Sequence, residues 1–233
     1  MSIAEELDVV VAPRLERLIL WNDCPGAWFD KNFRTRVKIG HTQALKVLGY
    51  LEPSIHVLEI RNTVIEFGTK ASPTTTVPSV KILGLRVRFG MHREAKALPT
   101  FLRCFPKVDT LHVMSAEADE PTGKLNFKFW QDVGPLQCLQ SHIKKVVFKD
   151  YHGYRSELAF LRFVMERAQL LQKMVVVLAD ASKEAVAEKL KPLACSTKRA
   201  SRDPEFMILV RKGGSAWSFR VASDLSKSDP FDC

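Results

Sequence analysis

Residues 78–85 read PSVKILGL, and residues 106–113 read PKVDTLHV. Each stretch has a proline two positions before an apolar residue, then two variable positions, an apolar residue, one variable position and a further apolar residue. A proline followed by alternating apolar residues is typical of a strand that begins after a turn. The two stretches therefore predict two copies of one structural unit.

Four other stretches share this pattern and extend the series over the chain. Pro13 begins PRLERLIL and Pro53 begins PSIHVLEI, while SHIKKVVF from Ser141 and QLLQKMVV from Gln169 keep the apolar positions without the proline. The six copies start 40, 25, 28, 35 and 28 residues apart. Several of these spacings lie in or near the range of 20–29 residues that is typical of leucine-rich repeats.

Segments with helical periodicity precede several of the strands. We predict helical structure over His41–Leu51, with Ala44, Leu48 and Leu51 on one face, and over Glu94–Phe105, with Pro99 close to the helix start. A third stripe runs from Leu158 to Ala168, with Ser156 as its N-cap. Alternating strands and helices predict an α/β fold in which parallel inner strands and outer helices form a right-handed, leucine-rich-repeat-like solenoid.

The repeat pattern becomes weaker after about Gln140, which suggests that the chain is organised in two parts. Residues 1–140 form the repeat array, and residues 141–233 continue and cap it. The predicted cap has a helix over about Ser182–Leu190 and two strands, Phe206–Arg211 and Trp217–Val221. Because Gly213 and Gly214 lie between these strands, we expect an antiparallel hairpin that covers the last layer of the core.

The composition is that of a globular protein, with 46% hydrophobic and 26% charged residues. The first residues carry no basic n-region, and the apolar runs are too short for a membrane span. Five cysteines without a C-x-x-C pair fit reduced thiols, some of them in the core, and hence the cytoplasm or nucleus. The net charge of +9 leaves a nucleic-acid-binding protein as an alternative, but the basic residues are scattered, so we favour a solvated basic surface.

The sequence also contains no signature of catalysis. The phosphate-loop, dinucleotide, zinc-protease and hydrolase motifs are missing, and the six histidines have no metal-ligand spacing. We therefore predict a non-catalytic protein without a cofactor or a bound metal.

Residues 124–179, and most specifically SHIKKVVFKDYHGYRSELAFLRFVMERA, resemble the FBD region of plant F-box proteins. The segment WSFRVASDLSKSDPFDC is similar to the end of that family, and the upstream repeats to its leucine-rich array. The resemblance implies a protein-binding scaffold, the substrate-recognition part of a Skp–cullin–F-box ubiquitin ligase. The first strand begins within a dozen residues of Met1, which leaves no space for an F-box. From this we expect no direct binding to the Skp-type adaptor.

Strand geometry predicts where such a scaffold binds its target. If the second and third apolar positions of each copy face the core, their neighbours face the concave side of the solenoid. Two readings of this face remain: it is open and binds a partner with an acidic, partly apolar segment, or loops or the terminal segment fold over it. The predicted binding residues are Arg17, Trp21, Arg61, Arg86, His112, Met114, Lys145, Lys149 and Lys173, with Ile19, Val57, Glu59, Ile82, Gly84, Thr110, Val147, Val175 and Val177 between them.

Overall fold

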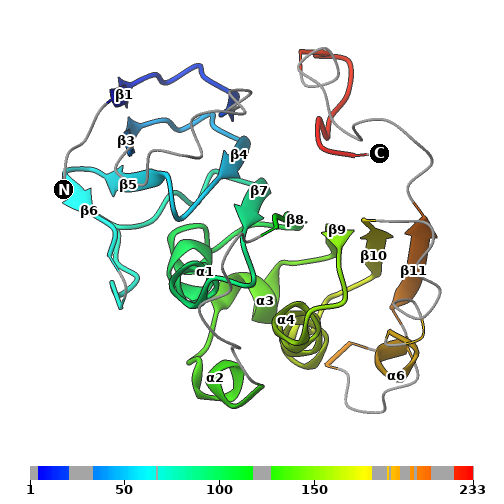
Figure 1. Cartoon of the computed structure of the whole chain (residues 1–233). Helices are drawn as coiled ribbons and strands as arrows, with labels where there is room; N and C mark the ends of the chain where they lie inside the picture. Colours follow the sequence, from blue (N-terminus) through cyan, green and yellow to red (C-terminus); the bar gives the residue numbers. More distant parts are fainter. Residues whose placement is uncertain are drawn as a thin grey trace.

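The protein has an α/β architecture in which parallel strands form an inner sheet and helices cover one of its faces (Figure 1). The computed structural model describes residues 5–20, 34–66, 68–117, 127–179, 188, 190–194, 200–201, 204–210 and 223–232. Within these residues the strands form two sheets, one of seven strands and one of four.

The inner sheet has seven strands in the order β11-β10-β9-β8-β7-β4-β2, and every neighbouring pair is parallel. Parallel pairing follows from the repeat, because each strand is reached through a crossover on the same face. The sheet continues without interruption from β8 to β9, across residue 140. Its strands are β2 (Arg17–Ile19), β4 (Val47–Leu51), β7 (Ile82–Val87), β8 (Thr110–Ser115), β9 (Lys145–Tyr151), β10 (Lys173–Leu178) and β11 (Glu205–Val210).

The outer layer consists of strands in the first repeats and of helices in the later ones. Near the N-terminus it is a second sheet, in which β1, β3 and β5 are parallel and β6 pairs antiparallel with β5. Farther along the chain the outer elements are helices. The outer strands are β1 (Glu5–Val11), β3 (Thr35–His41), β5 (His56–Ile60) and β6 (Thr63–Val64), and the helices are α1 (His92–Cys104), α2 (Phe127–Asp132), α3 (Gln137–Ser141), α4 (Arg155–Arg167) and α6 (Lys191–Ala194).

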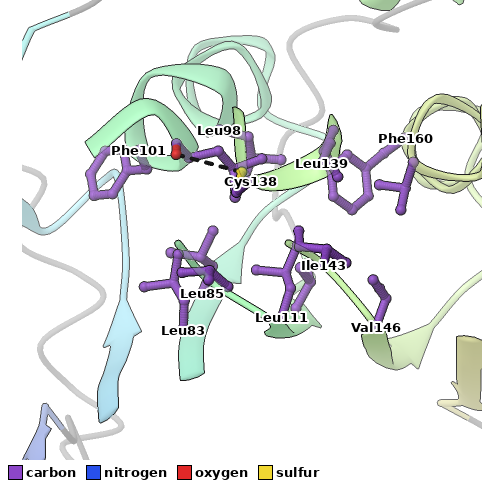
Figure 2. Close-up of a cluster of buried hydrophobic side chains, with 14 of the residues drawn as sticks. Leu83, Leu85, Leu98, Phe101, Leu111, Cys138, Leu139, Ile143, Val146 and Phe160 are labelled. Carbon is purple, nitrogen blue, oxygen red and sulfur yellow. Dashed lines mark hydrogen bonds between the residues drawn. The ribbon is translucent and has the colours of Figure 1, made fainter. Parts of the chain in front are cut away.

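One apolar core fills the space between the inner sheet and the outer layer. Figure 2 shows side chains of β7, β8 and β9 pointing toward those of α1, α3 and α4. The predicted core residues Leu83, Leu85, Leu111 and Val113 are fully buried there. Cys104 and Cys138 are buried free thiols, so the expectation that some cysteines are core residues is confirmed, and burial raises the pKa of each thiol to about 12.

The first repeats differ from our prediction. Residues 47–51, expected as the end of a helix, form β4, and all five are buried. The apolar run VLGYL, which contains a β-branched residue, an aromatic residue and a glycine, suits a fully buried strand better than a helix. The predicted strand PSIHVLEI is β5, which pairs with β3 in the outer sheet. The position next to β7 in the inner sheet is therefore filled by β4.

Two helix starts also differ from our prediction. Helix α1 begins at His92, so Pro99 lies in its interior rather than near its start. The Glu94 side chain accepts hydrogen bonds from the Arg88 backbone N–H (3.0 Å) and from Arg88 Nε (2.7 Å), which anchors the earlier start. In α4 the N-cap is Tyr154, and Ser156 is a buried residue of the first turn.

The predicted cap is described only in part. Strand β11 covers most of the predicted strand Phe206–Arg211, but it pairs parallel with β10 and so adds a rung to the array. The predicted second arm, Trp217–Val221, the turn at Gly213–Gly214 and most of the helix Ser182–Leu190 lie outside the described residues.

Candidate protein-binding face

The candidate site is the face of the seven-stranded sheet that is turned away from α1, α3 and α4, which we call the inner face. Alternation along each strand selects its residues. The register places Gly84 of β7, His112 of β8, Val147 of β9 and Val175 of β10 in one row across the sheet. Their chain neighbours Leu83, Leu111, Val146 and Met174 face the core, as predicted.

Seven of the nine predicted binding residues lie on strands of the inner sheet, at the positions that alternation assigns to the inner face. They are Arg17, Arg86, His112, Met114, Lys145, Lys149 and Lys173. Trp21 lies outside the described residues. Arg61 was wrongly placed: it follows β5 of the outer sheet, and its guanidinium donates a hydrogen bond to the carbonyl oxygen of Pro73 (2.6 Å).

The inner face is not bare, because residues 223–232, which we call the docked segment, lie on it. Figure 1 shows this segment, coloured red, on the side of the sheet opposite α1 and α4. Arg17 of β2 donates hydrogen bonds to the backbone carbonyls of Asp224 (3.2 Å), Leu225 (3.3 Å) and Lys227 (2.5 Å). Of the two interpretations of this face, the structure shows the covered one for β2, β4, β7, β8 and β9, and Val175 and Val177 of β10 are buried as well.

Two lysines of β9 hold the end of the docked segment. Lys145 Nζ lies 2.7 Å from Asp232 Oδ2 and 3.8 Å from Asp229 Oδ2. The buried Lys149 donates a hydrogen bond from its Nζ to the Phe231 carbonyl oxygen (2.5 Å). Because a buried ammonium needs such a partner, the docked segment satisfies a polar group that the sheet alone would leave unpaired.

The Phe231 ring fills an apolar pocket on the inner face. The ring is fully buried, 4.8 Å from the Tyr50 ring and 5.4 Å from the His112 ring between centroids. Gly84 forms part of this pocket, since a Cβ at that position would lie 3.3 Å from two carbon atoms of the Phe231 ring. Val47 belongs to the same apolar cluster as Tyr50 and Phe231, and Ile19, Ile82 and Met114 pack against this cluster.

A hydrogen bond joins His112 to the docked segment at the centre of the sheet. The His112 Nε2 atom lies 2.9 Å from Asp229 Oδ2. Burial lowers the pKa of His112, so the neutral ring donates its Nε2–H to the carboxylate. Burial alone would raise the pKa of Asp229, but the bond from His112, the Phe231 backbone N–H and the charge of Lys145 together lower it.

The rest of the face carries two ion pairs away from the docked segment. Arg86 lies 3.5 Å from Glu52, and Lys173 lies 3.3 Å from Glu205 on the neighbouring strand β11. Burial raises the pKa of Glu52 to about 6, against the opposing effect of Arg86.

Sequence reasoning missed Tyr50 and Glu52, because it read β4 as a helix. It also did not identify Asp229 and Phe231 as occupants of the face. The motif Asp229–Asp232, two acids with an aromatic between them in a basic chain, was the available signal, since the face was expected to prefer an acidic, partly apolar segment.

A second hollow lies on the helical side of the molecule. It has a volume of about 760 Å³ and lies between the loop 68–76, α1 and the residues around α2. Pro99, Leu102, Phe129 and Val133 give it apolar walls, and Thr100 adds a hydroxyl. It shares no residue with the inner face.

The described residues contain no group of three or more His, Cys, Asp or Glu side chains that could hold a metal ion. Among the same residues, no helix has both the length and the apolar character required to cross a bilayer.

Two family models match the chain in regions that agree with this architecture. The leucine-rich repeats of FBD-associated F-box protein At5g56370 match residues 1–113, which contain β1 to β8 up to Val113. The FBD model matches residues 131–176, which contain α3, β9, α4 and most of β10. Searches of the curated proteins and of the solved structures return no match. The two matched regions therefore resemble the leucine-rich repeats and the FBD region of FBD-associated F-box proteins.

Proposed function

We propose that this chain is the non-catalytic, target-binding part of a receptor of a Skp–cullin–F-box ubiquitin ligase. The observation that carries the proposal is the docked segment itself: the inner face already holds a peptide through its backbone carbonyls, two carboxylates and a phenyl ring. The leucine-rich-repeat and FBD families support a role in protein interaction. A target protein would present a segment of similar chemistry to the same face.

The chemistry of the face favours a protein ligand over a nucleic acid. A nucleic-acid site needs clustered cations along a phosphate backbone, with exposed aromatic rings for stacking. Here the cations are spread over separate strands, and the Tyr50 ring is buried in an apolar pocket. Lys145 and Lys149 are also directed at single carboxylate and carbonyl oxygens. This arrangement suits a peptide with acidic side chains.

The test is affinity capture with the full chain from plant cell extract treated with a proteasome inhibitor. Lys145→Glu combined with Lys173→Glu reverses two charges at the more exposed end of the face. The matched control is Lys107→Glu, which makes the same charge change at an exposed position in the turn before β8. We expect a set of ubiquitylated proteins that the double variant loses and the control retains. If a folded double variant captures the same proteins as the control, targets do not bind at this face. Recovery of nucleic acid instead of protein would support the alternative class.

A further inference from the structure

We infer that the docked segment is an internal ligand, and that a target must displace it by presenting the same chemistry: a turn-forming segment with an acid, an aromatic two positions later and a second acid directly after it. This inference rests on the proposed function, because it identifies the occupant of the same face. The template is Asp229, Phe231 and Asp232.

The contacts of the docked segment are those of a bound peptide. Its side chains differ in burial: Pro230 and Phe231 are buried, Asp224 and Asp229 are half-buried, and the others are exposed. Phe231 is fully buried in its pocket, while Leu225, which is also a large apolar residue, is 78% exposed. The Asp229 carboxylate also accepts the backbone N–H of Phe231 (3.1 Å), which fixes the turn that presents the ring to the sheet. The Phe231 ring is thus buried between two acids that contact the sheet. A buried aromatic anchor of this kind is typical of a recognition motif.

The docked segment is attached to the fold without being part of its core. Residues 223–232 form turns and bends and no strand, so they add no rung to the sheet. The main core lies on the opposite face, while Phe231 belongs to a separate cluster with Val47 and Tyr50. Release of the segment would therefore expose one small apolar pocket and leave the main core intact. Local opening of such a unit requires much less free energy than global unfolding.

An attached ligand sets a threshold for any competing partner. A covalently attached segment has an effective concentration on the order of 1 mM. If the free peptide bound with a dissociation constant of about 10 µM, the tethered copy would weaken the apparent affinity of a competitor about 100-fold. A target with only the same anchors would bind with this weakened affinity. Further contacts outside these anchors would offset the loss.

The test uses the full chain and a labelled synthetic peptide that spans Ser223–Asp232. Binding is followed by fluorescence anisotropy, and hydrogen exchange reports whether the attached segment is protected. The variant Phe231→Ala removes the anchor of the attached copy and leaves the pocket unchanged. The matched control is Ser228→Ala, an exposed position of the same segment. A second peptide, with Ala at the Phe231 position and Asn at the Asp229 and Asp232 positions, reports the specificity.

We expect the Phe231→Ala chain to lose protection of residues 223–232 and to bind the peptide at least tenfold more tightly than the wild-type and Ser228→Ala chains. The altered peptide should not bind any of them. Equal binding by all three chains would overturn the inference, and so would a folded Phe231→Ala chain that releases the segment but binds no peptide. Unchanged protection in Phe231→Ala would also overturn it, because the ring would then not be the anchor.

The outcome can be separated from the fate of the proposed function. If the Phe231→Ala chain binds no peptide but the wild type still captures targets that depend on Lys145 and Lys173, only the inference fails. If the peptide binds as expected and no captured protein depends on these lysines, the docked segment is an internal ligand and the proposed function fails.

Discussion

The imidazole of His112 and the carboxylate of Asp229 lie 117 positions apart in the sequence and 2.9 Å apart in space. Asp229, Lys145 and Lys149 are the charged groups that act on the ring, and the two lysines add to the effect of burial in lowering the pKa of His112. Within the described part of the chain, His112 Nδ1 has no hydrogen-bond partner. The docked state therefore prefers a neutral His112 and an ionised Asp229.

This preference predicts that acid weakens the docking of residues 223–232. A group whose pKa is lowered in the docked state stabilises that state at a pH above its ordinary pKa, and this stabilisation decreases as the pH falls. His112 should begin to oppose docking below about pH 6.5, and Asp229 below about pH 4. Hydrogen exchange of residues 223–232, corrected for the intrinsic rates, should show less protection at pH 5 than at pH 7.5. In His112→Gln, which can still donate to Asp229, the change around pH 6 should disappear. The same profile in both chains would contradict the role of His112.

The repeat pattern of the sequence predicted the inner sheet well from β7 to β10. Copies that begin with a proline or keep three apolar positions became β7, β8, β9 and β10 with the expected register. The prediction failed in residues 41–51, where the same apolar residues fit both a helix and a buried strand. In residues 41–51, Ala44, Leu48 and Leu51 satisfy a helical stripe, yet burial of the whole run on both faces favours the strand β4. Sequence periodicity alone does not distinguish a doubly buried strand from a buried helix.

The core assignment predicts a large effect of a single truncation. Leu111 is fully buried in the main core between β8 and the helices. Leu111→Ala should reduce the free energy of unfolding by about 3 kcal/mol, because it removes buried methyl groups and leaves a cavity. Urea denaturation measures this effect. The matched control is Leu170→Ala, the same substitution at a 47% exposed position, which should cost less than about 1 kcal/mol. Equal midpoints for the two variants would show that Leu111 is not a core residue.

A second stability prediction concerns Glu157, a fully buried residue in the first turn of α4. Its carboxylate accepts hydrogen bonds from Ser115 Oγ (2.6 Å), the Tyr154 backbone N–H (2.8 Å) and the His152 backbone N–H (3.2 Å). Glu157→Ala should cost about 3 kcal/mol, because it leaves buried donors without an acceptor. Glu157→Gln keeps one acceptor oxygen and should cost less.

The control for Glu157 lies on the same helix. Glu166 forms an i,i+4 ion pair with Arg162 at the surface, and Glu166→Ala should cost about 0.5 kcal/mol or less. Urea denaturation of the three variants ranks the effects. A cost for Glu157→Ala as small as that of Glu166→Ala would mean that the network does not hold the start of α4.

The sequence predicted most residues of the inner face, but it did not predict that residues 223–232 lie on that face. Alternation along the strands identified Arg86, His112 and Lys145 as inner-face residues, since it depends only on local geometry. Residues 223–232 reach the same face through contacts that span up to 210 positions, and no local periodicity encodes such a contact. The complementary charges of Lys145 and Asp232 are visible in the sequence, but many other pairs are equally complementary. Only the fold selects among them.

Gly84 gives the last prediction, because it lies directly beneath the Phe231 ring. A Cβ at this position would lie 3.2 Å from Tyr50 Cδ1 and 3.3 Å from two carbon atoms of the Phe231 ring, which is closer than ordinary van der Waals contact. Gly84→Val adds two more methyl groups in the same direction. The strand cannot move away, since Gly84 is paired in register with His112 and its neighbours Leu83 and Leu85 are in the core. The Phe231 ring should therefore leave the pocket.

We expect the Gly84→Val chain to lose hydrogen-exchange protection of residues 223–232 while its urea midpoint for global unfolding changes little, since valine suits a strand. The free peptide should not bind this variant either, because the added methyl groups fill its pocket; in this respect Gly84→Val should differ from Phe231→Ala. The matched control is Thr110→Val, a change to the same residue on the inner face of the adjacent strand β8. Full protection of the docked segment in a folded Gly84→Val chain would show that the ring is not held against Gly84.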